Sequence, residues 1–143
     1  MTICPDGLNT VKEGEWEEVE LAVDSGAADT VINEDMVIPA ITREGTASNR
    51  GVEYEVANGA RIPNLGEKKF VGVSNEGISR KLTAQLCEVN KGLLSVSKIT
   101  NGGSRVVFDS DGSYIEDKNT REKMYLKEKN GMHMLTLWTK RGF

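Results

Sequence analysis

The chain has 143 residues and a mass of 15.7 kDa, a length that fits one domain and leaves no room for a second of full size. Hydrophobic residues make up 38% and charged residues 28%, a composition that excludes a disordered protein. The net charge of −4, without a basic stretch, argues against nucleic acid as a partner, and two cysteines with one histidine argue against a metal site or a disulfide framework.

The chain start lacks the basic region and apolar run of a signal peptide. No stretch approaches the roughly 20 apolar residues of a membrane span. We therefore expect a cytoplasmic protein with no membrane partner, no cofactor and no metal.

The predicted elements begin after residue 14, since residues 1–14 show no periodicity and are expected to form an arm. Residues 15–23 alternate in their second half and predict a half-buried strand, and residues 30–32 predict a second short strand. Residues 36–50 are mixed and interrupted by proline, which predicts a loop.

The middle of the chain predicts a hairpin, another strand and one helix. Residues 52–57 alternate and are followed by Asn58-Gly59, a two-residue turn signal in which both positions need positive φ. The return strand runs from residue 60 to 63 and continues through 68 to 73, and residues 82–89 predict another strand. Residues 93–99 have i, i+3 apolar spacing, which predicts one short helix ended by the Asn-Gly-Gly at 101–103.

The last 40 residues contain four regularly spaced strand candidates, at 105–108, 113–116, 123–127 and 132–137. Turn-forming segments join them, so we expect a β-meander of two hairpins. The sequence thus predicts an all-β protein with one short helix and a C-terminal meander.

The segment with the clearest indication of a catalytic role is centred on Asp24. A hydrophobic strand ends in Asp24-Ser25-Gly26-Ala27, and a second hydrophobic strand begins a few residues later. Gly26 would allow close backbone approach, and Ser25 places a hydroxyl beside the carboxylate. The simpler alternative is a tight turn in which Asp24 accepts a hydrogen bond from its own backbone.

Such a carboxylate becomes useful when a second one faces it. Two carboxylates about 3 Å apart cannot both ionise, so they share a proton, and one can activate water while the other polarises a carbonyl. The chain contains one such arrangement. The second carboxylate would come from another copy of the chain, which predicts a C2 homodimer.

Four blocks of sequence resemble the retropepsin family, the homodimeric aspartic proteases of retroviruses and retrotransposons. They are residues 23–31 (VDSGAADTV), 54–63 (YEVANGARIP), 92–99 (GLLSVSKI) and 106–115 (VVFDSDGSYI). The closer similarity is to the protease region of copia-type retrotransposon polyproteins, and it covers about residues 16–138. The resemblance implies an acid-protease barrel at residues 15–103, preceded by the arm at 1–14 and followed by a C-terminal meander extension at 104–143.

The resemblance also implies roles for individual residues. Asp24 would be the catalytic aspartate, supported by Ser25, whose hydroxyl would bond across the dimer, by Gly26 and by Ala27. The residues on the substrate and flap side would be Asp29, Tyr54, Asn58 and Gly59, with the hairpin at Asn58-Gly59 closing over the peptide. Leu93 and Leu94 would pack beneath the active-site loop.

The sequence departs from the retroviral pattern at several positions, among them Ser95, where retroviral enzymes have glycine and copia-type sequences commonly have serine. Many retroviral relatives have an acidic residue where Ala28 stands and an arginine where Val96 stands, and these two form an ion pair that braces the dimer. Both positions are apolar here, so another part of the chain would have to hold the dimer together.

The expected activity is endopeptidase cleavage of a retroelement polyprotein by a homodimer, in the cytoplasm or within a virus-like particle. The alternative is a catalytically inactive module of retropepsin fold that serves dimerisation or peptide binding. A third reading is a purely structural domain of a retroelement particle.

Overall fold

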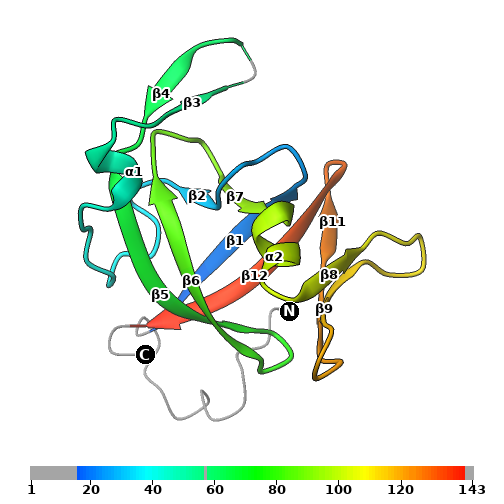
Figure 1. Ribbon diagram of the computed structural model, residues 1–143. Coiled ribbons are helices and arrows are strands. Elements are labelled where there is room, and N and C mark those ends of the chain that lie inside the picture. The colour runs from blue at the N-terminus through cyan, green and yellow to red at the C-terminus, as the bar shows by residue number, and fades with distance from the viewer. Residues whose placement is uncertain (1–15, 57, 141–143) are drawn as a thin grey trace.

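The computed structural model describes residues 16–56 and 58–140, and the predicted arm at residues 1–14 lies outside them. In this part of the chain there are twelve strands and two short helices, so the predicted all-β class is confirmed (Figure 1). The strands are β1 (Trp16–Asp24), β2 (Val31–Ile32), β3 (Glu53–Glu55), β4 (Arg61–Pro63), β5 (Gly66–Ser74), β6 (Ser79–Leu86), β7 (Gly92–Ser95), β8 (Ser104–Val107), β9 (Tyr114–Asp117), β10 (Lys123–Tyr125), β11 (Lys127–Lys129) and β12 (Met132–Lys140). The helices are α1 (Thr46–Asn49) and α2 (Val96–Asn101).

The main sheet contains seven strands in the order β1-β7-β2-β6-β5-β12-β11. β1 also pairs with β12, antiparallel from Trp16↔Lys140 to Ala22↔Met134, so the pairings lead from β12 back to β1. The pairs β1–β7 and β2–β6 are parallel. The first and last described strands therefore lie side by side (Figure 1).

The core is built from the alternation that predicted the strands. Val19 and Leu21 of β1 are buried, as are Ala84 and Leu86 of β6. The single residue between the members of each pair is only partly buried. Alternate side chains of a strand point to opposite faces, which is why this pattern selects one face for the core. The buried cluster is Val19, Leu21, Ile32, Val37, Phe70, Ile78, Ala84, Leu86, Leu94, Ile115, Met124, Leu135 and Leu137.

A buried lysine and a glutamate fasten the loop that follows β2. Lys68 is 3% exposed, and its Nζ donates to the backbone carbonyls of Glu34 at 2.8 Å, Met36 at 3.0 Å and Val37 at 3.3 Å. The Glu17 carboxylate accepts the N–H of Val37 at 2.8 Å. Lys68 of β5 and Glu17 of β1 thus hold a segment whose sequence shows no periodicity.

The predicted helix at residues 93–99 is wrong in its first part. Leu93 and Leu94 belong to β7, where they pair in parallel with Ala22 and Val23 of β1. The helix α2 begins only at Val96, because the Ser95 side chain accepts the N–H of Lys98 and caps it. A buried strand running directly into a helix produced the apolar spacing that resembled a helix.

The loop predicted at residues 36–50 contains the one-turn helix α1, so the chain has a helix that the sequence reading missed. Its first turn is closed by Gly45 and Ser48, since Gly45 N–H donates to Ser48 Oγ at 2.9 Å. The predicted hairpin at 52–63 is confirmed as β3 and β4. At its turn Gly59 has a φ of 84°.

The meander predicted for the last 40 residues divides into two parts. β8, β9 and β10 form a separate three-stranded sheet, whereas β11 and β12 join the main sheet. The single strand predicted at 123–127 is broken at Leu126, whose N–H donates to Ser113 O at 2.9 Å. The predicted division at residue 103 therefore runs through a shared sheet, because β12 contributes to the same sheet as β1.

Candidate active site

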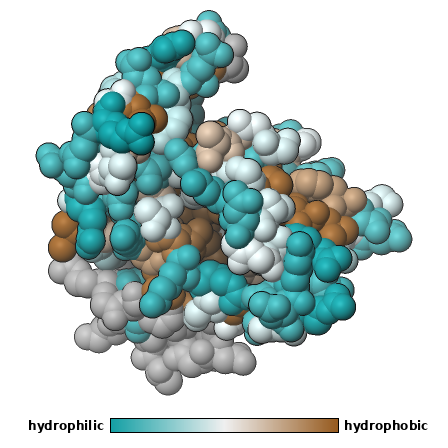
Figure 2. All heavy atoms as spheres, in the orientation of Figure 1, coloured by the Kyte–Doolittle hydropathy of each residue, from teal (hydrophilic) through white to brown (hydrophobic). Residues whose placement is uncertain are grey.

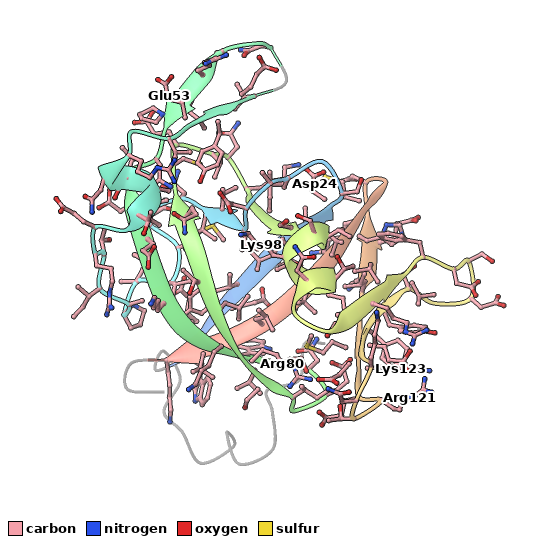
Figure 3. The ribbon with its side chains drawn as sticks, in the orientation of Figure 1. Asp24, Glu53, Arg80, Lys98, Arg121 and Lys123 are labelled. Carbon is pink, nitrogen blue, oxygen red and sulfur yellow. The ribbon has the colours of Figure 1, made fainter. Side chains whose placement is uncertain are left out.

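Asp24 is the last residue of β1, at the point where the chain leaves the main sheet and turns toward β2. In the parallel pairing of β1 with β7 it lies opposite Ser95, the last residue of β7. Because β7 leads directly into α2, the Asp24 loop and the start of α2 are neighbours, as Figure 3 shows for Asp24 and Lys98. The carboxylate is half-buried at the edge of the core.

One carboxylate oxygen of Asp24 is engaged and the other is open. Oδ1 accepts the N–H of Gly26 at 2.8 Å. Within residues 16–56 and 58–140, no hydrogen bond or ion pair reaches Oδ2. A Cβ at position 26 would lie 3.4 Å from Oδ1, and Ser25 and Gly26 are both exposed. The loop therefore presents an aspartate that a second molecule can approach.

Ser95 anchors this loop from below. It is 0% exposed, and its Oγ–H donates to Ala27 O at 2.7 Å while its N–H donates to Thr30 Oγ1 at 3.2 Å. The same Oγ accepts the N–H of Lys98 at 3.2 Å and so caps α2. One buried hydroxyl thus joins the Asp24 loop to the helix.

Sequence reasoning did not identify Ser95 as a functional-site residue. The available signal was its place directly before a helix, where serine is a preferred N-cap. The contact with Ala27 spans 68 positions along the chain, and no local pattern reports such a contact. Leu93 and Leu94, predicted to lie beneath the loop, are in β7 beside β1, and Leu94 is buried.

The structure brings Asp29 and Tyr54, two of the predicted substrate-side residues, into direct contact. Tyr54 O–H donates to Asp29 Oδ2 at 2.9 Å, joining the β3–β4 hairpin to the loop that carries Asp24. Asn64 Nδ2 donates to the Tyr54 hydroxyl at 3.0 Å and to Gln85 Oε1 at 2.8 Å. A polar network therefore fixes the base of the hairpin against the main sheet.

Burial raises the pKa of Tyr54 to about 12, and the Asp29 carboxylate adds to this rise as hydrogen-bond acceptor and as a nearby negative charge. The Asn64 amide acts in the opposite direction. Tyr54 is thus a neutral donor at physiological pH, which is the form that the bond to Asp29 requires.

Asn58 and Gly59 lie at the exposed tip of the hairpin, away from the Asp29–Tyr54 contact. Gly59 N–H donates to Val56 O at 2.8 Å, and Ala60 N–H donates to Asn58 Oδ1 at 2.9 Å. β3 and β4 form a two-stranded sheet of their own, which projects from the body of the molecule (Figure 1). The hairpin is attached at its base and free at its tip.

An ion pair links the Asp24 loop to α2 close to the two apolar positions that depart from the retropepsin pattern. Ala28 is exposed and Val96 is half-buried. Asp29 Oδ1 lies 3.4 Å from Lys98 Nζ, so a carboxylate and a cation connect the same loop and the same helix from neighbouring positions. The Lys98 side chain is 60% exposed, and such a pair contributes little to stability.

A cavity of about 500 Å³ lies between β6, α2 and the three-stranded sheet. Asp29 and Thr30 line it, but Asp24 does not. Its apolar lining includes Leu94, Leu135 and Leu137, and Figure 2 shows a hollow with hydrophobic residues at its floor and hydrophilic residues around it. The volume is in the range of small-molecule or side-chain pockets.

Other potentially reactive groups are arranged as structural residues. Cys87 is buried, and burial raises the pKa of its thiol, which disfavours the reactive thiolate. The His133 ring lies against the Phe108 ring in a tilted arrangement, with an interplanar angle of 58° and centroids 4.8 Å apart. Within the described residues, no group of three or more His, Cys, Asp or Glu could hold a metal ion, and no helix is long and apolar enough to cross a membrane.

Comparisons of the chain with protein-family models, with curated proteins and with solved structures found no match.

Proposed function

We propose that this chain is an aspartic endopeptidase that acts as a homodimer, with one Asp24 from each subunit. The observation that carries the proposal is the placement of Asp24. Asp24 is the last residue of the half-buried strand β1, its loop is fastened by the buried Ser95, and its Oδ2 is open to a second carboxylate.

The reaction would proceed with water as the nucleophile. In the dimer the two Asp24 carboxylates share one proton, so one is a general base and the other a hydrogen-bond donor. The base removes a proton from water as the water oxygen adds to the peptide carbonyl, which the donor polarises. The resulting tetrahedral intermediate then breaks at its C–N bond as a proton passes to the leaving amine.

The finer parts of the proposal follow the resemblance to retropepsins. We assign the main sheet, in which β12 pairs back to β1, to an acid-protease barrel. The β3–β4 hairpin would be the flap, held at its base by Tyr54 and closing with Asn58 and Gly59 over an extended substrate. The substrate class is a peptide segment of a retroelement polyprotein.

A specific observation also supports the inactive alternative. The bond from Gly26 N–H to Asp24 Oδ1 is the bond that an aspartate in an ordinary turn makes. Asp109 makes the same bond with the N–H of Asp111, at 3.1 Å. Asp24 would then be a turn residue in a dimerisation or peptide-binding module of the same fold.

The substitution Asp24→Asn separates these readings, with Asp109→Asn as the matched control. Both variants replace a carboxylate whose Oδ1 accepts a backbone N–H two residues on. We expect Asp24→Asn to abolish cleavage of a longer precursor, followed by mass spectrometry at mildly acidic pH, while Asp109→Asn cleaves like the unaltered chain. A statine-type transition-state mimic should block the same cuts.

Sedimentation across a range of concentrations tests the dimer directly. Cleavage that persists in Asp24→Asn would overturn the proposed mechanism. A chain that neither cleaves nor dimerises would support neither the enzyme nor the dimerisation module.

A further inference from the structure

The strand β6 has a free edge along its first half. It pairs with β5 over its whole length, from Ser79↔Val73 to Leu86↔Gly66. On its other side it pairs with β2 only at its end, through Gln85 and Leu86. Lys81 and Thr83 therefore have a neighbouring strand on one side only, and both residues are exposed.

The direction of the backbone groups on this free edge follows from the bonds at its end. Gln85 N–H donates to Thr30 O at 2.8 Å and Cys87 N–H donates to Ile32 O at 3.2 Å, both away from β5. Alternate residues of a strand direct their N–H and C=O groups to the same side. Those of Lys81 and Thr83 therefore also point away from β5, and in the described part of the chain no hydrogen bond reaches their N–H groups.

The cavity of about 500 Å³ lies directly beside this edge. Lys81, Leu82 and Thr83 line it on the β6 side, and Ile99 lines it on the α2 side. Leu82 belongs to the core-facing set of β6 and packs against the buried cluster. A strand added beside β6 would direct the side chain next to Leu82 to the same face, which is the face of the cavity.

The charges at the rim favour an acidic neighbour at one position. Arg80 lies 3.5 Å from both Asp117 and Glu122, and Lys98 is paired with Asp29. Lys81 has no ion pair within the residues that the structure describes. In the added strand, the residues on either side of the one opposite Leu82 point outward, so a carboxylate at one of these positions would lie beside Lys81.

We propose that the free edge of β6 is a second peptide-binding site. An extended segment adds as a strand along Lys81–Thr83, places a large apolar side chain in the cavity beside Leu82, and sets an acidic residue next to Lys81. Main-chain hydrogen bonds hold the segment, and the cavity selects its side chain. Asp24 does not line this site, and the inference holds whether or not the chain is a protease.

The test uses a fluorescein-labelled heptapeptide, Thr-Thr-Glu-Phe-Glu-Thr-Thr, whose sequence is symmetric about Phe and so suits either strand direction. Binding to the full chain is measured by fluorescence anisotropy, with the Asp24→Asn chain in parallel so that the probe cannot be cut there. We expect equal affinity for both chains. Replacing Phe by Ser, or both Glu by Lys, should weaken binding by about tenfold or more.

Two substitutions at one position test the main-chain contact. Thr83→Pro removes the N–H on the free edge without touching a bond to β5, and Thr83→Val is the matched control. We expect Thr83→Val to bind like the unaltered chain and Thr83→Pro to lose at least about tenfold in affinity. Circular dichroism and thermal unfolding verify that both variants are folded.

Amide hydrogen exchange gives a readout that needs no variant. On saturation with the probe, exchange at Lys81 and Thr83 should slow by about tenfold or more, with Leu82 and Ala84 unchanged. Absence of binding, or equal binding by Thr83→Pro and Thr83→Val, would overturn the proposal. Binding without added protection at Lys81 and Thr83 would do so as well, since it would place the probe elsewhere.

Discussion

Replacing Ser95 by alanine removes the hydroxyl that joins the Asp24 loop to α2. In the unaltered chain this oxygen donates to Ala27 O at 2.7 Å and accepts the N–H of Lys98 at 3.2 Å. Alanine preserves the strand pairing with Asp24, because that pairing uses only the backbone. The substitution therefore isolates the side-chain bonds.

The expected loss is about 2 kcal/mol in the free energy of unfolding, of which loss of the helix cap contributes about 1 kcal/mol and loss of the bond to Ala27 O about 1 kcal/mol. Ser95 is 0% exposed, so water does not replace the lost partners without rearrangement. The loop that holds Asp24 should loosen, and any cleavage activity should fall with it.

Urea unfolding followed by tryptophan fluorescence measures this loss. Ser97→Ala is the matched control, because the exposed Ser97 shares one hydrogen bond with Ser95 Oγ at 3.0 Å, and its loss leaves the bonds of Ser95 to Ala27 and Lys98 in place. We expect the control to change stability by at most about 0.5 kcal/mol. If Ser95→Ala were as stable as Ser97→Ala, the argument that Ser95 fastens the loop would be refuted.

Three further substitutions test other parts of the structure. Lys68→Met leaves three backbone carbonyls without their shared donor and should cost about 2 kcal/mol or more by urea unfolding; a change below about 0.5 kcal/mol would contradict this role. Gly92→Ala should destabilise the core by about 1–3 kcal/mol, because the added Cβ would lie 2.5 Å from Leu21 Cδ2; unchanged thermal unfolding would show that the core adapts. The pKa of Tyr54 is raised above that of an unfolded tyrosine, so its stabilising contribution is complete below pH 10 and is lost as the pH rises through about 12. An ultraviolet titration of tyrosinate should show a step near pH 12 that disappears in Tyr54→Phe, and its persistence there would assign it to another tyrosine.

Much of the β structure could be predicted because local alternation records which side of a strand is buried. The alternation at Val19 and Leu21, and at Ala84 and Leu86, predicts a strand without information on which strands lie beside it. The same local reasoning failed at residues 93–99, where spacing alone does not distinguish a strand followed by a helix from a single helix. Pairing between neighbouring strands was predictable from the turn signal at β3–β4, but distant pairing was not, since nothing near β12 indicates that it lies beside β1.

The loop of the candidate site could be recognised in the sequence, but the contacts that hold this loop in place could not. Asp24 and Gly26 were recognisable because Asp24-Ser25-Gly26 lies between two hydrophobic segments that predict strands. The contact of Tyr54 with Asp29 and that of Ser95 with Ala27 join segments 25 and 68 positions apart. Such contacts depend on the tertiary structure, which sequence periodicity does not encode.

The pairing of β1 with β12 also determines when the main sheet can form during synthesis. β1 is made well before β12, whose residues Met134 to Lys140 are its partners along one edge. During synthesis that edge stays open until β12 has left the ribosome, and contacts so distant in sequence slow folding. Asp24 ends this strand, so a nascent chain that stops before residue 132 has β1 paired with β7 on one edge and without β12 on the other.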